Sequence, residues 1–342
     1  MADDESRELW ENTPLLCTDR RGLLALRQEI VRQFYANLTT DQVTVLCPQE
    51  GVFLAMNALL SPGDHVVAVS PAYQSLTSVA ESIECEVSLW KCREDDSDPN
   101  LPLVFRVSDL ERLLLPTTKL VVVNFPHNPT GFLPSPAEWE ALIALCRARG
   151  IFLFSDEMFR GLERDPTLQL APAAALYDKA VSLSGMSKVF GMPGIRLGWL
   201  ASQDQDFLAS VAKMKDYTSL AAPNPSQVLA LIGLRNMATL LERGRAAIDK
   251  GIQAVEGFMN VHRDVFAFTP PLAGPIAFVK VRSATRETVA EYAAKLVKAS
   301  GVLILPGQVF GDETFNDRFR LSVGRSNVLE VMAAWEAAFV AP

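Results

Sequence analysis

Residues 182–201 read Ser-Leu-Ser-Gly-Met-Ser-Lys-Val-Phe-Gly-Met-Pro-Gly-Ile-Arg-Leu-Gly-Trp-Leu-Ala, and this stretch decides the fold of the chain. The apolar run at 180–183 is typical of a short buried strand. A loop rich in serine and glycine follows at 184–187 and presents a single lysine, Lys188. Because a lysine in a mostly apolar pocket has a lowered pKa, its neutral amine becomes available to form a Schiff base. Lys188 is therefore a candidate catalytic residue.

Three glycines and one arginine follow this lysine, namely Gly191, Gly194, Gly198 and Arg196. Glycine suits places where the backbone turns sharply or approaches a ligand closely. A guanidinium in such a place is able to hold a phosphate through two hydrogen bonds. The segment alone also fits a surface lysine beside a flexible turn, so the rest of the chain has to decide between the two interpretations.

The composition of the 342-residue chain is that of an ordinary globular protein, with 49% hydrophobic and 21% charged residues. The net charge is −8 and no block of lysine and arginine stands out, which argues against a nucleic-acid or membrane partner. The acidic N-terminus lacks the basic and apolar parts of a signal peptide. No apolar run approaches the ~20 residues that a membrane span needs.

The number and spacing of the cysteines and histidines indicate the cellular compartment and whether a metal site is expected. The five cysteines are scattered and odd in number, which suits a reducing compartment, so we expect a cytoplasmic protein. None of the three histidines has metal-ligand spacing to a cysteine or another histidine. We therefore expect no zinc or iron site.

Short apolar runs alternate with helical patterns through the first 225 residues. The expected strands are residues 43–46, 65–70, 86–90, 119–125, 151–155, 180–184 and 195–201. The expected helices are residues 22–37, 49–60 and 73–83, and two that start with capping boxes at Ser108 and Ser135. This alternation predicts an α/β sheet covered on both faces, whose ligands lie at the carboxyl ends of the strands.

The pattern changes after about residue 225 and predicts a smaller α+β domain. Its expected elements are a long bridging helix at 226–259, strands at 265–268, 276–282, 302–305 and 318–323, a helix at 285–299, and a last helix capped by Asn327. The predicted division is an N-terminal segment (1–37) packing with the small domain, a large domain (38–235) and a small C-terminal domain with the interdomain helix (236–342). Residues 93–102 are expected to form a solvated loop.

Unusual residues follow five of the predicted strands. They are Cys47-Pro48-Gln49-Glu50 opening a helix, Tyr73 after Pro71, Asn128 in the turn Pro126-His-Asn-Pro-Thr-Gly131, the pair Asp156-Glu157, and Lys188. A carboxylate that ends an apolar strand is unfavourable unless it is paired. Each residue alone has a structural explanation, as a turn, a core or a surface residue, so their joint order carries the prediction.

The order Asn-Pro-Thr-Gly, Asp-Glu, Ser-Lys and Arg, each after its own strand, resembles the class I/II aminotransferases, the fold-type-I pyridoxal phosphate (PLP) enzymes. The resemblance implies an α/β fold with a large domain built on a mostly parallel seven-stranded sheet, plus a smaller α+β domain. It also implies PLP as cofactor, an amino acid as substrate and a homodimer.

The resemblance assigns a role to each candidate. The implied catalytic residues are Lys188 as Schiff base, Asp156 on the pyridine nitrogen and Tyr73 stacked on the ring. The implied cofactor-binding residues are Pro48, Gln49 and Glu50 at a helix N-terminus, Tyr73, Asn128 on the ring hydroxyl, Asp156, Phe159, Ser184, Ser187, Lys188 and Arg196 on the phosphate. The implied substrate-binding residues are Asn128 and Arg320, the latter holding the α-carboxylate.

Within the family, three stretches are most similar to the capreomycidine-synthase-like branch. They are Pro48-Gln-Glu-Gly51 to Pro62-Gly-Asp-His65, then Tyr73-Gln-Ser-Leu76, then Ser184-Gly-Met-Ser-Lys188. That branch includes cyclases acting on hydroxylated arginine derivatives and presumed aminotransferases. Three functions therefore stay open: an aminotransferase, a PLP lyase or cyclase of the same fold, and a protein that binds PLP or a partner without turnover.

The chain departs from the family pattern at several positions. A phenylalanine, Phe159, stands where the family usually has a tyrosine that bonds the ring oxygen, which leaves Asn128 for that role. The usual Gly-Ala phosphate loop is Cys47-Pro48, so one N–H group is missing. Cys17 replaces a tyrosine that reaches the partner's phosphate, and Gly185 replaces a serine. The chain also begins a few dozen residues later than its relatives, whose N-terminal arm covers the substrate.

Overall fold

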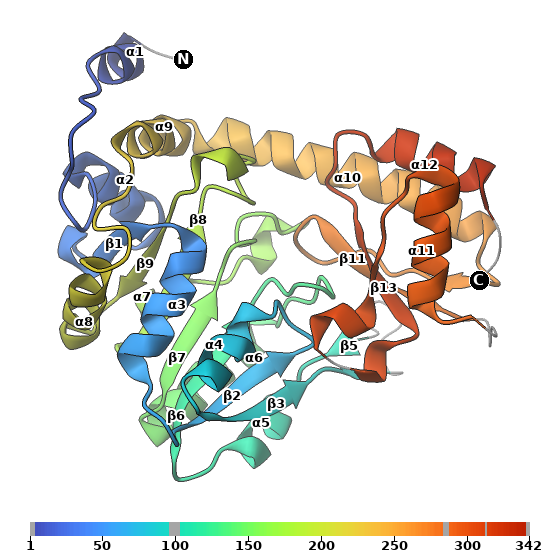
Figure 1. The fold of residues 1–342 in the computed structure, drawn as a ribbon, viewed down its shortest axis with the longest axis horizontal. Coiled ribbons are helices and arrows are strands. Elements are labelled where there is room, and N and C mark those ends of the chain that lie inside the picture. The colour runs from blue at the N-terminus through green and yellow to red at the C-terminus, as the bar shows by residue number, and fades with distance from the viewer. Residues whose placement is uncertain (1–3, 96–102, 283–286, 312, 340–342) are drawn as a thin grey trace.

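The computed structural model describes residues 4–95, 103–282, 287–311 and 313–339 (Figure 1). Its strands are β1 Val43–Leu46, β2 His65–Ser70, β3 Glu86–Lys91, β4 Arg93–Glu94, β5 Leu103–Val104, β6 Thr118–Asn124, β7 Phe152–Asp156, β8 Ala180–Gly185, β9 Gly198–Ser202, β10 Phe266–Ala267, β11 Ile276–Val281, β12 Leu305–Pro306 and β13 Arg318–Ser322. Its α-helices are α1 Asp4–Glu11, α2 Leu24–Phe34, α3 Pro48–Leu59, α4 Ser75–Ser82, α5 Val107–Leu113, α6 Pro136–Arg149, α7 Ala173–Leu176, α8 Gln205–Lys215, α9 Asn224–Arg235, α10 Met237–Val261, α11 Val289–Ser300 and α12 Val328–Ala337.

The larger sheet has seven strands in the order β1-β9-β8-β7-β6-β2-β3. Strands β8, β7, β6, β2 and β3 run parallel, whereas β9 is antiparallel to both of its neighbours. Every residue of β2 and β8 is buried, because helices such as α3 and α6 cover the sheet. The predicted mostly parallel seven-stranded sheet is confirmed.

A smaller antiparallel sheet, in the order β10-β11-β13-β12, lies at the other side of the molecule with α11 and α12 (Figure 1). The 25-residue helix α10 runs along one edge of the molecule and joins the two parts. Strand β13 ties the parts together through an ion pair, because Arg318 contacts Glu94 of β4 in the larger part. Lys280 of β11 also reaches Glu94, at 2.7 Å.

Several predicted helix ends need correction. The single helix expected at 226–259 is two helices, α9 and α10, because the chain leaves the helical conformation at Asn236, whose side chain bonds back to Ile232 O at 2.8 Å. The capping box at Ser135 is confirmed, with Glu138 in its reciprocal role. The capping box at Ser108 is wrong, because α5 already begins at Val107 and Ser108 lies inside its first turn.

Two predictions near the C-terminus are also wrong in detail. Asn327 precedes α12 but makes no side-chain cap hydrogen bond, since its backbone is not in the extended conformation of a cap. The strand expected at 302–305 is limited to Leu305–Pro306, where pairing with β13 begins. The first residues of the helix expected at 285–299 lie outside the described residues, and α11 begins at Val289. The loop expected at 93–102 is wrong at its start, because Arg93 and Glu94 form β4 and pair with β5, and residues 96–102 lie outside the described residues.

The N-terminal segment lies at the end of the molecule opposite the smaller sheet (Figure 1). Helix α2 contacts α9 and β1, and α1 contacts α9. The prediction placed this segment with the small domain, whereas its contacts are with α9 and the larger sheet. The domain boundaries themselves stay a prediction.

Candidate active site

The candidate residues converge because three parallel strands end side by side. Asn124, the last residue of β6, is paired in register with Asp156, the last residue of β7, and Asp156 is paired with Leu183 of β8. The loops that carry Asn128 and Lys188 leave this same edge of the sheet. The structure thus brings together residues that lie 60 positions apart in the sequence.

Asp156 is a buried carboxyl group with few partners. Its Oδ1 accepts a hydrogen bond from the Met158 amide at 3.0 Å, and it forms no ion pair with any residue that the structure describes. Burial is the main cause that raises its pKa to about 7, against the opposing influence of the Met158 amide and Lys188. A carboxyl group in this state accepts a cationic N–H partner readily.

Asn124 holds this corner of the site together, and the sequence reasoning missed it. Its amide nitrogen donates to the backbone oxygen of Asp156 at 3.0 Å, and its Oδ1 accepts from the backbone N–H of Asn128 at 2.9 Å. The side chain therefore fixes β7 against the loop that carries Asn128. A polar residue closing the apolar run at 119–125 was the signal that could have identified it.

Lys188 reaches solvent at the mouth of the site. Its partial burial lowers the pKa of the amine, and the positive charges of Arg320, Arg196 and Arg325 lower it further, while Asp156 acts in the opposite direction. The ammonium group of Lys188 therefore loses its proton more readily than that of an ordinary lysine. The sequence predicted a mostly apolar pocket around Lys188, whereas the structure leaves Lys188 exposed and places charged side chains near it; the lowered pKa agrees with the prediction in direction.

Arg320 enters the site from β13 of the smaller sheet. Its Nη1 donates to Asn128 Oδ1 at 3.1 Å, and its guanidinium lies 5.2 Å from the ring centroid of Phe310. Burial and the nearby charge of Arg325 lower the pKa of Arg320. The hydrogen bond to Asn128 crosses from the smaller part of the molecule to the larger one, and it leaves the other guanidinium nitrogens without a side-chain acceptor among the described residues.

The N-terminus of α3 faces the glycine-rich loop. Its first amides, those of Gln49 and Glu50, have no acceptor within the helix, whereas Pro48 has no amide hydrogen at all. Arg196 lies beside them, with its Nη2 donating to Cys47 Sγ at 3.6 Å. The backbone of Arg196 is left-handed at φ 53°, which directs the chain out of the turn after Pro193. Helix amides and one guanidinium form an anion-binding corner.

Two departures from the family pattern are linked by packing. A Cβ atom built on Gly185 would lie 3.0 Å from Cγ of Pro48 and equally close to two backbone atoms of residues 197 and 198. A Cβ on Gly198 would lie 2.7 Å from the same Pro48 atom. The proline ring and the backbone of residues 197 and 198 therefore together occupy the space that a side chain at position 185 would use.

The remaining predicted residues differ in exposure. Tyr73 follows β2 and is 50% exposed, so one face of its ring is free to cover a ligand. Ser184 is buried at the end of β8 and Ser187 is half-buried in the loop before Lys188. Phe159 is buried, and its ring packs against Gly274. Because Phe159 has no hydroxyl group, this position supplies packing and no hydrogen bond.

Glu157 supports the site from behind. It is buried, its Oε1 accepts from Ser182 Oγ at 2.6 Å and from the Ala173 amide at 2.8 Å, and Arg160 Nε lies 3.3 Å from its other oxygen. Burial raises the pKa of Glu157, and Arg160 is the main influence against that rise. Glu157 thus joins β7 to β8 and α7 and is a structural residue.

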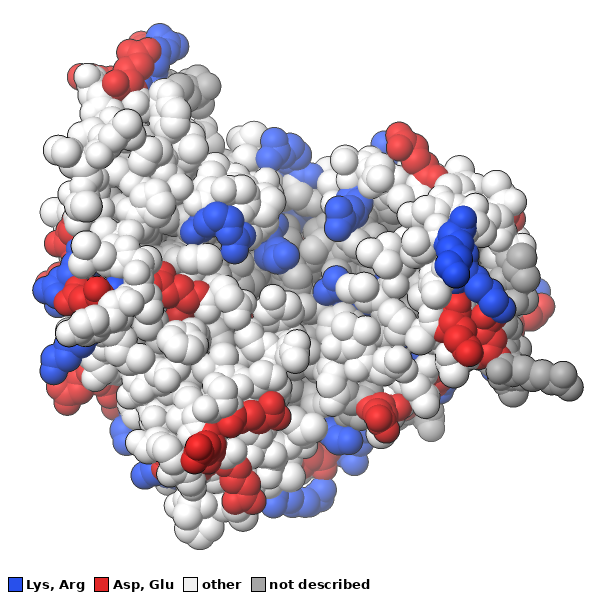
Figure 2. Space-filling model, viewed as in Figure 1, with Lys and Arg blue, Asp and Glu red and all other residues white. Residues whose placement is uncertain are grey.

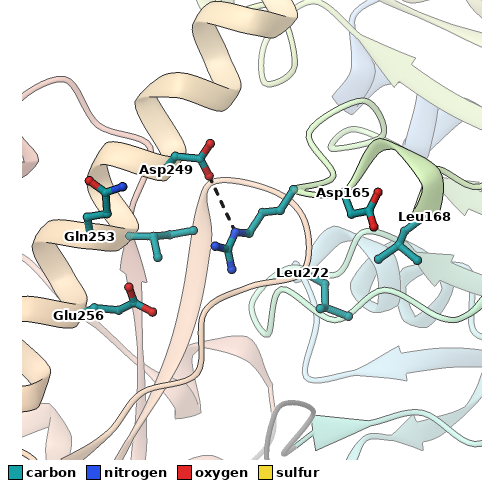
Figure 3. Close-up of a pocket in the computed structure, with 8 residues that line it drawn as sticks. Asp165, Leu168, Asp249, Gln253, Glu256 and Leu272 are labelled. Atoms are coloured by element: carbon teal, nitrogen blue, oxygen red, sulfur yellow. Dashed lines mark ion pairs between the residues drawn. The ribbon is translucent and has the colours of Figure 1, made fainter.

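One cavity of about 660 Å³ lies between α10 and the chain around residue 165 (Figure 3). Its lining includes Arg164 and Asp249, which form an ion pair at 3.8 Å across it. None of the predicted site residues lines this cavity. In the described parts of the chain, no cluster of three or more His, Cys, Asp or Glu residues is arranged to hold a metal ion, and no helix is long and apolar enough to cross a membrane.

Comparison with known proteins agrees with this geometry. The sequence profile of the family "Aminotransferase class I and II" matches residues 5–334. The chain is 30% identical to capreomycidine synthase of Streptomyces vinaceus, over 80% of this chain and 67% of the relative. It is 26% identical to aspartate aminotransferase of Sulfurisphaera tokodaii, over 89% of this chain and 77% of the relative. The solved structure of the PLP-dependent cyclase OrfR is similar with a TM-score of 0.85 and 25% identity, over 97% of this chain and 88% of that one.

Proposed function

Because the chain belongs to the class I and II aminotransferase family, whose enzymes depend on pyridoxal phosphate, we propose that it transfers the amino group of an amino acid through Lys188. The observation that carries this proposal is that Asp156 and Lys188 follow neighbouring strands, β7 and β8, and act on each other's pKa. Burial raises the pKa of the acid to about 7 and lowers that of the amine, so both groups are prepared for proton-linked chemistry.

The residues of the site fit the cofactor. The second oxygen of the buried Asp156 carboxyl has no hydrogen-bond partner among the described residues, which suits a pyridinium N–H. The corner formed by the Gln49 and Glu50 amides and Arg196 suits a phosphate. Tyr73 is free to cover the ring, and Asn128 has its amide nitrogen free to donate to the ring oxygen, because its carbonyl oxygen is already bonded to Arg320.

When bound, pyridoxal phosphate supplies an electron sink for the bond that breaks at Cα of the substrate. The chain itself does the rest. We assign to the neutral amine of Lys188 the removal and return of the Cα proton, since its lowered pKa favours the unprotonated amine. Asp156 keeps the pyridine nitrogen protonated by accepting its hydrogen bond in the ionised form.

We assign the substrate α-carboxylate to Arg320, whose unbonded guanidinium nitrogens form a fork of the geometry that a carboxylate requires. The hydrogen bond to Asn128 prevents rotation of that fork. Phe310 lies against the guanidinium and keeps water from it. The Arg320–Asn128 hydrogen bond therefore links the residue that would hold the substrate carboxylate to the residue that would donate to the cofactor's ring oxygen.

A lyase or cyclase of the same fold is the second candidate, and the similarity to capreomycidine synthase and to the cyclase OrfR supports it. Such an enzyme expels a substituent or closes a ring, for example on a hydroxyarginine-type substrate, after the same proton transfer. Stoichiometric conversion of the cofactor to its amine form by an amino acid supports transamination. Release of a rearranged product with the cofactor unchanged supports the alternative.

We also propose a homodimer. Large apolar side chains are exposed on one side of the larger part, with Leu15 at 86%, Leu16 at 74% and Tyr217 at 91%. The loop of Tyr217 is joined to the anion-binding corner, because Thr218 Oγ1 donates to Glu50 at 2.5 Å. A second copy bound here would close the phosphate end of the site. Light scattering of the wild type and of Leu16→Glu tests the proposal, and a monomeric wild type would contradict it.

A cytoplasmic location remains a proposal and is supported by the five described cysteines, which are all free. Cell fractionation tests it.

The function is tested by reducing the cofactor-loaded protein with borohydride and finding the labelled peptide by mass spectrometry. We expect the label on Lys188, no label in Lys188→Ala, and full labelling in Lys213→Ala, a control at an exposed lysine of α8. The same preparations are then given a panel of amino acids, including arginine derivatives, and the products are identified. A label on another lysine, or a protein that changes no amino acid, would refute the proposal.

A further inference from the structure

The loop at residues 216–220 is folded around one buried lysine, Lys215, the last residue of α8. The Nζ of Lys215 donates to Ser219 Oγ at 2.9 Å and to the carbonyl oxygen of Leu220 at 3.0 Å. The carbonyl oxygen of Lys215 accepts from the amides of Thr218 and Leu220, at 3.2 and 2.9 Å. Lys215 therefore holds the loop through both its side chain and its backbone.

This arrangement costs the protein stability in two ways. Leu220 has a left-handed backbone at φ 59°, which is unfavourable for a residue with a Cβ atom. An ammonium group is also unfavourable in a buried position, and burial lowers the pKa of the Lys215 amine, while the charges of Glu50 and Asp216 act in the opposite direction. The proposed chemistry at Lys188 does not use Lys215. Local features that cost stability are typical of residues that support a functional site.

The loop contacts the first turn of α3 through Glu50. Thr218 Oγ1 and the amide of Ser219 both donate to Glu50 Oε1, at 2.5 and 3.3 Å. Glu50 is the third residue of α3, a position from which a glutamate is able to fold back onto the helix N-terminus. In this structure its carboxylate accepts hydrogen bonds from the loop instead.

The direction of the Glu50 carboxylate matters because the N-terminus of α3 belongs to the anion-binding corner. That corner consists of the amides of Gln49 and Glu50 and the guanidinium of Arg196. Figure 2 shows lysine and arginine side chains gathered around the hollow between the two halves of this face, with most acidic side chains nearer the edges. A carboxylate that turned back onto the helix N-terminus would be attracted by the same amides and would compete with a phosphate.

We propose that Lys215 is a positioning residue that keeps the anion-binding corner free, because it folds the 216–220 loop so that the loop holds the Glu50 carboxylate away from the N-terminus of α3. The inference rests on the proposed function, in which this corner binds the phosphate of the cofactor. Loss of Lys215 should therefore weaken the binding of the phosphate group and leave the binding of the pyridine ring unchanged.

The test compares two probes, pyridoxine 5′-phosphate and pyridoxine, in equilibrium binding to the full chain freed of cofactor. The probes differ only in the phosphate group, and neither has the aldehyde that reacts with Lys188. In Lys215→Met the affinity for pyridoxine 5′-phosphate should fall about tenfold, the size expected when one charge competes at a helix N-terminus. The affinity for pyridoxine should change less than about twofold, since the ring binds at a separate place.

Three further variants separate the proposed role from a general loss of structure. Thr218→Val removes only an exposed hydroxyl that donates to Glu50, and it should lower the affinity for the phosphate ester alone, by about threefold. Adding Glu50→Gln to Lys215→Met should restore most of the lost affinity, because a neutral side chain does not compete with an anion. Lys213→Met changes an exposed lysine of the same helix and is the matched control, which should bind both probes as the wild type does.

Equal losses for both probes in Lys215→Met, or no loss for the phosphate ester, would overturn the inference. Failure of Glu50→Gln to restore the affinity would also overturn it, because the Glu50 carboxylate would then not be the competitor. Thermal unfolding and light scattering show whether each variant is folded and keeps the assembly state of the wild type. If Lys215→Met does not fold, Thr218→Val decides, and an unchanged affinity of that variant for the phosphate ester would refute the role of the loop.

These outcomes are distinguishable from failure of the proposed function. A protein that is labelled on Lys188 and converts an amino acid, yet binds the phosphate ester equally well in Lys215→Met, retains the function and loses this inference. A wild type that binds pyridoxine 5′-phosphate no more tightly than pyridoxine would contradict both, because the anion-binding corner would then hold no phosphate.

Discussion

Replacing Asp156 with asparagine should stabilise the cofactor-free protein at pH 8, although Asp156 is central to the proposed chemistry. The pKa of this carboxyl is raised from 3.8 to about 7 by burial. The folded state therefore prefers the protonated form, and stability falls as the pH rises from 3.8 to about 7, then stays constant. At 1.36 kcal/mol for each pKa unit, the full effect is about 4 kcal/mol at pH 8.

About 1.6 kcal/mol of this loss is already present at pH 5, so wild type should lose a further ~2–3 kcal/mol between pH 5 and pH 8. The asparagine variant should not, because its side chain does not ionise. Asparagine is also able to keep the hydrogen bond from the Met158 amide. The same substitution should weaken the binding of pyridoxal phosphate, since the carboxylate that pairs with the pyridinium is gone.

The assay is urea unfolding of both cofactor-free proteins at pH 5 and pH 8, at one fixed protein concentration. The difference between variant and wild type is compared across the two pH values, so that other titrating groups cancel. Asp165→Asn is the control: hydrogen bonds from Thr167 lower the pKa of Asp165, so its effect lies below this pH range. A variant no more stable than wild type at pH 8, or an unchanged difference, would refute the reasoning about Asp156.

Three further substitutions test the structure away from this carboxyl. Burial lowers the pKa of His127 from 6.5 to about 3, so this residue should contribute a loss of about 2.5 kcal/mol between pH 7 and pH 4.5 as the unfolded chain takes up a proton, and the stability of His127→Phe relative to wild type, measured by urea unfolding, should rise by that amount over the same range. Gly251→Ala should lower the free energy of unfolding by ~3 kcal/mol or more, because its Cβ would lie 1.6 Å from a carbonyl oxygen, whereas Gly257→Ala in open space on the same helix should raise it by up to ~1 kcal/mol. Glu94→Gln should lower the free energy of unfolding by about 1–3 kcal/mol, since it removes the nearer of two carboxylates from the buried Arg318 guanidinium and leaves Asp317 at 3.9 Å, and an unchanged midpoint would show that the ion pair with Glu94 is unimportant.

The sequence predicted the larger sheet well because its signals are local. Apolar runs at 43–46 and 65–70 match β1 and β2 at both ends, since a strand buried on both faces needs a continuous apolar stretch. The break at Asn236 was missed because the apolar periodicity continues through it, and only the backbone conformation of Asn236 and its side-chain hydrogen bond to Ile232 O reveal it. Local patterns identify elements better than they identify their ends.

The residues of the candidate site also fall into two groups, those that the sequence identified and those that it did not. Asp156 and Lys188 were identifiable because each follows its own apolar run, and the convergence of strand ends needs only the parallel topology. Asn124 was not identified, because its importance depends on the register of β6 against β7 and on its hydrogen bonds to the backbone of Asp156 and Asn128. The packing reason for Gly185 was equally hidden until the position of Pro48 was known.

Strand β13 carries two arginines that lie two residues apart, and both contact the larger part of the molecule. Arg318 forms an ion pair with Glu94, and Arg320 donates a hydrogen bond to Asn128. A strand held at two neighbouring points resists pivoting about either one. A movement of the smaller sheet away from the larger one must break both contacts together. We therefore expect the two parts to separate in one cooperative step, without a partly open intermediate. Arg320, to which we assign the substrate carboxylate, therefore also makes one of the two contacts that such an opening must break.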